Sequence, residues 1–110
     1  MPYVTITPQN RTLSITAGDT HLGETRHALE LKEGSYPPVL YIPRADVDMS
    51  LLEKTTHQTI CPHKGLCSYY SVKTPQGLLD NAVWSYEAPI PGVADIAGHL
   101  AFYPDKVTLA

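Results

Sequence analysis

Ten prolines are spread along this chain of 110 residues, and they limit its fold more than any other feature. Proline lacks an amide hydrogen, so it is poorly tolerated inside helices and central strands. We therefore expect many short elements joined by turns. The length is that of one domain with one core, and we treat residues 1–110 as a single domain.

Short runs of alternating apolar and polar residues fill the spaces between the prolines. Such alternation, with many β-branched and aromatic residues, is typical of β-strands. Residues 27–33 also contain helix-favouring Ala, Leu and Glu, but we favour a strand because the segment is short and Gly34 ends it. The predicted strands are residues 3–7, 12–16, 20–25, 27–33, 39–42, 66–73, 78–86, 100–103 and 107–109.

Turn residues indicate how these strands connect. Residues 8–10 predict a hairpin between the first two strands, and residues 74–77 predict another. Residues 39–42 are a continuous apolar run and a candidate central strand, whereas residues 46–52 and 93–97 predict short helical turns. Because the connectors are too short for crossover helices, we expect an all-β fold with mainly antiparallel sheets.

The charge and hydropathy of the chain argue against several classes of partner. Its net charge is -3 and its pI about 5.9, without the basic patch of a nucleic-acid-binding protein. No apolar stretch reaches the roughly 18 residues of a membrane span, and the first residues show no signal-peptide pattern. We therefore expect a cytoplasmic protein with its two cysteines reduced.

Segment 57–70 contains more reactive side chains than any other part of the chain. Cys61 is followed by His63 and Lys64, and nearby cations favour the thiolate form of a cysteine. Cys61 is therefore a candidate reactive thiol, with Cys67 as a resolving thiol. The alternative is a buried cysteine at a strand end, since cysteine is among the most buried residue types.

The same segment permits a second, weaker hypothesis, which is a zinc site. Zinc prefers cysteine and histidine ligands in proteins. A candidate set consists of Cys61, His63 and Cys67 with either His57 or His99. The spacing is not that of the paired Cys-x2-Cys knuckles, so the sequence predicts no metal site and identifies no cofactor.

Four segments along the chain carry an ordered set of motifs. They are residues 41–47 (YIPRADV), 61–65 (CPHKG), 81–86 (NAVWSY) and 96–103 (IAGHLAFY). In this order they resemble the motifs of the DUF427 domain family, whose function is uncharacterised, and the resemblance covers nearly the whole chain. It implies a small all-β fold of the Mss4-like kind, shaped like a tent or barrel.

Some members of that wider fold group bind zinc, and some reduce methionine sulfoxide. In the family, a small residue such as alanine is commoner at the position of Cys67. The resemblance therefore does not imply a chemistry that needs both cysteines.

The motifs also contain the groups that a binding pocket needs. Arg44 can hold a carboxylate or phosphate through two hydrogen bonds, and Lys64 with Gly65 can offer a charge and exposed amide groups. Pocket walls are mostly aromatic and apolar, and only one of Tyr69 and Tyr70 can face any pocket, because neighbouring strand residues point to opposite sides. The candidate ligand-binding residues are Arg44, Lys64, Gly65, Tyr69, Trp84, Tyr86 and His99.

Several of these candidates also have a purely structural interpretation. Arg44 can form an ion pair with Asp46 or Asp48. Trp84 can belong to the core, where large aromatic side chains are common. His99 can be a rim residue that is hydrogen-bonded to the backbone.

These observations predict a pocket for a small polar or anionic ligand, and they identify no catalytic residue. The alternative is a non-enzymatic structural or interaction module, in which the same residues fix turns and packing. Redox or zinc chemistry at Cys61 is a minor alternative. An exposed strand edge leaves a homodimer open.

Overall fold

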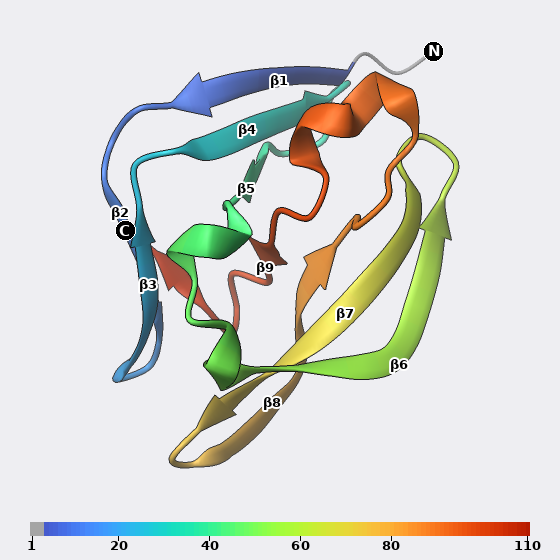
Figure 1. The fold of residues 1–110 in the computed structure, drawn as a ribbon. Helices are drawn as coiled ribbons and strands as arrows, with labels where there is room; N and C mark the ends of the chain where they lie inside the picture. The colour runs from blue at the N-terminus through green and yellow to red at the C-terminus, as the bar shows by residue number, and fades with distance from the viewer. Residues whose placement is uncertain (1–3) are drawn as a thin grey trace.

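The computed structural model of the protein describes residues 4–110, whose strands form three separate antiparallel sheets (Figure 1). The first sheet has the order β1 (Val4–Gln9), β4 (Ala28–Glu33), β5 (Val39–Tyr41). The second has the order β10 (Thr108–Leu109), β2 (Leu13–Ala17), β3 (Thr20–Thr25). The third has the order β6 (Leu52–Cys61), β7 (Gly65–Thr74), β8 (Gly77–Ser85), β9 (Ala101–Phe102). The predicted all-β, antiparallel fold is confirmed, and the sheets do not close into a barrel.

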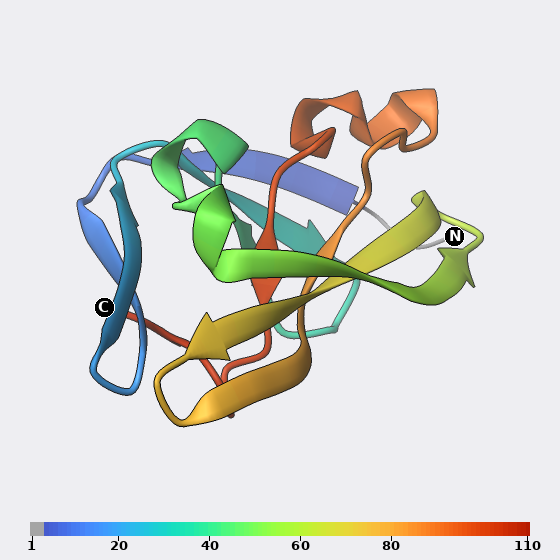
Figure 2. The same ribbon diagram turned by 60° about the horizontal axis from the view of Figure 1, so that its bottom comes forward.

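Within residues 4–110, short 3-10 helices connect the strands. They are η1 (Arg44–Asp46), η2 (Met49–Leu51) and η3 (Pro91–Ile96). The helical turns predicted within residues 46–52 and 93–97 correspond to η2 and η3. Asp48 caps η2, because its carboxylate accepts a hydrogen bond from the amide of Ser50 at 3.1 Å. Figure 2 shows η3 on the same side of the molecule as β1. None of the helices in this described range has the length and apolar character needed to cross a membrane.

The first predicted hairpin is wrong. β1 pairs with β4, where Val4 lies opposite Glu33, whereas β2 pairs with β3 and β10. The chain therefore leaves one sheet and enters another at residues 10–12. An alternating pattern indicates which face of a strand is buried and not which strand it pairs with. The hairpin predicted around residues 74–77 is confirmed as β7–β8.

Two further strand predictions differ from the structure, and both concern sheet edges. β6 extends to Cys61 through mostly polar, exposed residues, and no apolar alternation marked it in the sequence. Polar edge strands are common, because charge discourages pairing with another chain. Residues 39–42 were predicted as a central strand, but the strand β5 covers Val39–Tyr41 and lies at the edge of its sheet, beside β4. Ile42 adds a single bridge to Leu100.

β7 separates two clusters of buried side chains. Tyr69 packs in one cluster with Tyr41 and Tyr86, whereas Tyr70 and Val72 pack in the larger core. As predicted, successive side chains of this strand point to opposite faces. The larger core also contains Leu13, Ile15, Ala17, Leu22, Ala28, Ile42, Val47, Leu52, Ala82, Val83, Leu100, Phe102 and Val107.

A close contact between β3 and η1 fixes the position of Arg44. A Cβ atom at Gly23 would lie 2.1 Å from the carbonyl oxygen of Asp46, so only glycine allows the two segments to approach in this way. Nearby, the hydroxyl of Thr25 donates to Asp46 Oδ2 at 2.7 Å. The guanidinium of Arg44 consequently lies over the ring of Tyr70, with Cζ 5.4 Å from the ring centroid.

Candidate functional site

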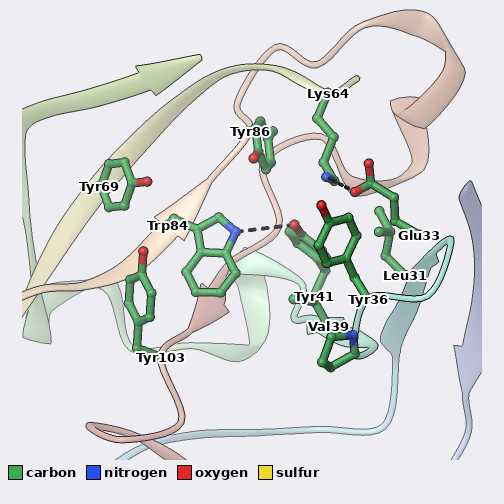
Figure 3. A pocket seen from close by; sticks show the side chains of 11 residues that line it. Leu31, Glu33, Tyr36, Val39, Tyr41, Lys64, Tyr69, Trp84, Tyr86 and Tyr103 are labelled. Atoms are coloured by element: carbon green, nitrogen blue, oxygen red, sulfur yellow. Dashed lines mark hydrogen bonds and ion pairs between the residues drawn. The ribbon is translucent and has the colours of Figure 1, made fainter. Parts of the chain in front are cut away.

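Five tyrosines and the single tryptophan line one hollow of about 280 Å³ (Figure 3). The hollow, which we call the aromatic pocket, lies between the ends of β4 and β5 on one side and β7 and β8 on the other. Its lining residues are Leu31, Glu33, Tyr36, Pro37, Val39, Tyr41, Lys64, Tyr69, Trp84, Tyr86 and Tyr103. The structure therefore brings together four of the candidates, namely Lys64, Tyr69, Trp84 and Tyr86.

Strand pairing positions the central wall of this pocket. Tyr69 on β7 lies opposite Trp84 on β8, and paired residues of antiparallel strands project to the same face. The indole Nε1 donates to the hydroxyl of Tyr41 at 3.3 Å, as Figure 3 shows. On the other side of the indole lies the ring of Tyr103; the centroids of the two rings are 4.7 Å apart and the interplanar angle is 54°. Trp84 is thus held from both sides while its ring remains half-buried at the pocket.

The polar end of the pocket is an ion pair between Lys64 and Glu33. Lys64 Nζ donates to Glu33 Oε1 at 2.6 Å, and the two side chains are only 11% and 13% exposed. The ammonium also lies 3.7 Å from Cys61 Sγ and 5.9 Å from the centroid of the Tyr86 ring. Because the lysine and the glutamate carry opposite charges, the pair has no net charge.

Gly65 contributes through its backbone and not as a pocket wall. Its φ of 115° is a conformation that residues with a side chain rarely adopt, and it lets the β6–β7 turn close behind Lys64. The carbonyl of Lys64 accepts a hydrogen bond from the amide of Ile90 at 2.9 Å. The turn and the Pro-rich loop after β8 (residues 87–92) therefore support each other and hold the lysine in place.

Burial disfavours ionisation of three of the pocket tyrosines, namely Tyr41, Tyr69 and Tyr86. Loss of contact with water raises the pKa of Tyr41 to about 12, although the hydrogen bond from Trp84 partly offsets this rise. Burial likewise raises the pKa of Tyr69 to about 12, although a hydrogen bond with Thr59 partly offsets the rise. Burial also raises the pKa of Tyr86, by a larger amount. At neutral pH these phenols are protonated, and each can both donate and accept a hydrogen bond.

Arg44 does not line the aromatic pocket, so the prediction that it shares a hollow with Lys64 and Trp84 is wrong. Its guanidinium donates to Tyr70 Oη and Glu87 Oε2, each at 3.1 Å. It also donates to the carbonyl of Gly98 at 3.1 Å and to Ser85 Oγ at 3.4 Å. The ion-pair partner is therefore Glu87, and neither Asp46 nor Asp48 as the sequence suggested.

Glu87 is the centre of what we call the Arg44 network, which consists of Arg44, Lys54, Tyr70, Ser85 and Glu87. Lys54 donates to Glu87 Oε1 at 2.7 Å and Tyr70 donates to Oε2 at 2.6 Å. Burial alone would raise the pKa of Glu87, but these hydrogen bonds and the charge of Lys54 outweigh it and lower the pKa to about 2. The carboxylate is therefore ionised at neutral pH, and both of its oxygens accept hydrogen bonds from within the chain.

His99 also lies outside the aromatic pocket. Its carbonyl accepts a hydrogen bond from Ser85 Oγ at 2.7 Å, and its ring Nδ1 lies 3.2 Å from the carbonyl of Ala97. These contacts match the structural interpretation, in which the histidine is bonded to nearby backbone.

The two cysteines are free thiols in different surroundings. Cys61 is half-buried and lines a neighbouring hollow with Glu33, Tyr36, Val39 and His63. Cys67 is buried, and burial raises the pKa of its thiol, so it is a poor resolving thiol. Among residues 4–110, no three His, Cys, Asp or Glu side chains gather closely enough to hold a metal ion, and the zinc set is not assembled.

Sequence reasoning missed several residues of the site. Tyr41 and Tyr103 lie inside two of the four motifs, so their position could have drawn attention to them. Glu33 and Tyr36 carry no such signal. Glu33 ends β4 and Tyr36 lies in the loop that follows, and these segments meet the β6–β7 turn only in three dimensions. Glu87 was likewise hidden in the Pro-rich loop.

The fold and the site together define a small all-β domain with an aromatic pocket beside a buried ion pair. The family model described as a domain of unknown function (DUF427) matches residues 5–110, and the chain therefore belongs to this family. The resemblance found in the four motifs is confirmed. A comparison with curated proteins gave no match.

Proposed function

We propose that the aromatic pocket binds a small polar ligand that is either uncharged or zwitterionic. The observation that carries this proposal is the position of the Lys64–Glu33 pair, which lies at one end of a hollow otherwise walled by aromatic rings. Ligand pockets typically combine apolar walls with a few converging polar groups. Tyrosine hydroxyls add neutral hydrogen-bonding groups around the pair.

The charge of the pair narrows the class of ligand. A simple anion would be attracted by Lys64 and repelled by the nearby carboxylate of Glu33. A zwitterion can place its negative group against the ammonium and its positive group against the carboxylate. The anionic ligand expected from the sequence is therefore less well matched than a zwitterion or a neutral polar molecule.

The contacts within the Arg44 network favour a structural role for Arg44. Each polar group of Arg44 and Glu87 described above already has a partner within the chain. The structural module expected as an alternative thus accounts for Arg44, whereas ligand binding accounts for the aromatic pocket. No catalytic step is part of the proposal.

Two finer expectations belong to the same proposal. The free state of both cysteines agrees with a reducing compartment, and the proposed location is the cytoplasm. The separate antiparallel sheets are compatible with an Mss4-like arrangement. A homodimer remains an additional proposal, which sedimentation of the purified protein tests directly.

Fluorescence of the single tryptophan offers a direct test, because Trp84 is itself a pocket wall. Wild-type protein is titrated with short 2-amino acids as zwitterions, with neutral sugars, and with carboxylates and phosphates. We expect saturable changes with a zwitterion or a neutral polar compound, and a rise in the thermal midpoint with the same compound. No response from any of the compounds would refute the proposal.

The matched variants are Lys64→Met and Lys54→Met. Both remove a lysine that pairs with a carboxylate, but only Lys64 lines the pocket. Because Lys64→Met also affects stability, Tyr36→Ala serves as a second pocket variant: this side chain is 69% exposed and costs little stability to remove. Binding that survives in both pocket variants would contradict the assignment of the site.

A further inference from the structure

We propose that the ligand of the aromatic pocket is amphipathic, and that its apolar part lies in a second hollow that adjoins this pocket. This inference rests on the proposed function and specifies the class of molecule. The second hollow, which we call the apolar groove, has a volume of about 480 Å³. It includes Pro38, Leu40, Phe102, Pro104 and Leu109, which do not line the aromatic pocket.

The two hollows share a wall. Tyr36, Pro37, Val39 and Trp84 line both of them, so a molecule that touches the indole from the polar side is next to the groove. Figure 3 shows Tyr36, Val39 and Trp84 around the pocket, with Lys64 and Glu33 at its far end. One ligand can therefore reach the ion pair and the groove together.

Polarity changes along this path. The aromatic pocket contains the charged pair and the hydroxyl groups of five tyrosines. Of the described residues that line the apolar groove, none is charged. A charged group gains most beside Lys64 and Glu33, and a hydrocarbon gains most where it replaces water against Leu40, Phe102 and Leu109. The head of the ligand is thus assigned to the ion pair and its tail to the groove.

Part of the groove wall is conformationally restricted, which favours binding over collapse. Three of its lining residues are prolines, whose ring fixes the backbone φ angle. Phe102 is buried in the larger core, and the half-buried Leu40 packs against that core. A wall that is already fixed loses little conformational entropy when a ligand binds.

A homologous series of straight-chain 2-amino acids tests this assignment. Their zwitterionic head stays constant while the chain grows from two carbons upward, and fluorescence of Trp84 reports binding. For wild type, we expect affinity to rise about fourfold for each added methylene until the groove is filled. In Leu109→Asp the gain per methylene should disappear, while affinity for the shortest member stays within about twofold.

Two further variants keep the test decisive. Pro38→Asp places a charge at an exposed part of the groove and should also remove the gain per methylene, even where Leu109→Asp fails to fold. The matched control is Leu78→Asp, because Leu78 is an exposed leucine that lines neither hollow. We expect the full gain per methylene in this control.

Failure of this inference differs from failure of the proposed function. If the short amino acids bind but longer chains bind no better, the aromatic pocket stands and the amphipathic ligand is refuted. The same holds if the gain per methylene persists in both groove variants, or if a second copy of the chain occupies the groove and blocks it. If no member of the series and no neutral polar compound binds, both proposals fall.

Discussion

The aromatic pocket and the Arg44 network contain the same kinds of groups on opposite faces of β7. Each has a cation paired with a glutamate beside a tyrosine ring, with Tyr69 on the pocket face and Tyr70 in the network. In the network, the guanidinium of Arg44 donates hydrogen bonds to groups from several parts of the chain, including the backbone carbonyl of Gly98. In the pocket, the Lys64–Glu33 pair borders a hollow.

This difference shows that the residue type does not decide the role of a charged side chain. A guanidinium whose donors are shared among several segments holds these segments together. An ammonium that faces a cavity can exchange part of its contacts for those of a ligand. Variants of Lys64 and of Arg44 should therefore differ in their effects on stability and on ligand binding.

The largest expected effect comes from the pocket side. In Lys64→Met, Glu33 loses the partner of its carboxylate. Because the Glu33 side chain is only 13% exposed in the wild-type protein, the free energy of unfolding should fall by about 3 kcal/mol. Denaturation by urea measures this change. In Lys54→Met, where the lysine side chain is 53% exposed, the loss should stay below about 1 kcal/mol.

The double variant Glu33→Gln, Lys64→Met sharpens this comparison. Removal of both charges should restore most of the lost stability, because no unpaired charge remains buried. If Lys64→Met and Lys54→Met lose the same free energy of unfolding, burial does not make the Lys64–Glu33 pair more important for stability than the Lys54–Glu87 pair.

The next largest effect concerns the network. Arg44→Ala removes hydrogen bonds to Gly98, Tyr70 and Glu87 and should lower the free energy of unfolding by about 2 kcal/mol. Arg26→Ala is the control, because this arginine is exposed, and its effect should stay within about 0.5 kcal/mol. Binding of a short 2-amino acid should be unchanged in folded Arg44→Ala. A loss of binding without a loss of stability would instead place Arg44 in the ligand site.

The smallest expected effect is a decrease in the free energy of unfolding at acidic pH. The network lowers the pKa of Glu87 from 4.5 to about 2, so folding favours the ionised carboxylate. This stabilisation is complete above pH 4.5 and is lost as the pH falls towards 2. Its size should be about 1 kcal/mol, because the side chain is a third exposed and water screens it. Urea denaturation at a series of pH values should show this loss for wild type and not for Glu87→Gln; identical profiles would remove Glu87 as the cause.

Local patterns predicted much of the fold and four of the eleven residues that line the aromatic pocket. Alternation and turn residues identified β7, β8 and the hairpin between them, and also the opposite orientation of Tyr69 and Tyr70. These are properties of neighbouring residues in one strand or one turn. The pairing of β1 with β4 could not be predicted in this way, because the partner strand is distant in sequence.

The same limit applies to the candidate site. Lys64 was identified by its place in a motif, but nothing near it in sequence indicated that its partner would be Glu33. Arg44 and Lys64 looked alike as candidate cations. The contacts across β3, β7 and β8 assigned one of them to a closed network and the other to a cavity.

The sequence by itself determined the all-β class, the family and the set of groups available for binding, because strand periodicity, turn chemistry and ordered motifs are local along the chain. Only the tertiary structure decided which cation lines the aromatic pocket and which one joins distant segments of the chain. The physical reason is that burial and pairing of charge depend on segments that are far apart in sequence. Their approach is fixed by the packing of all three sheets.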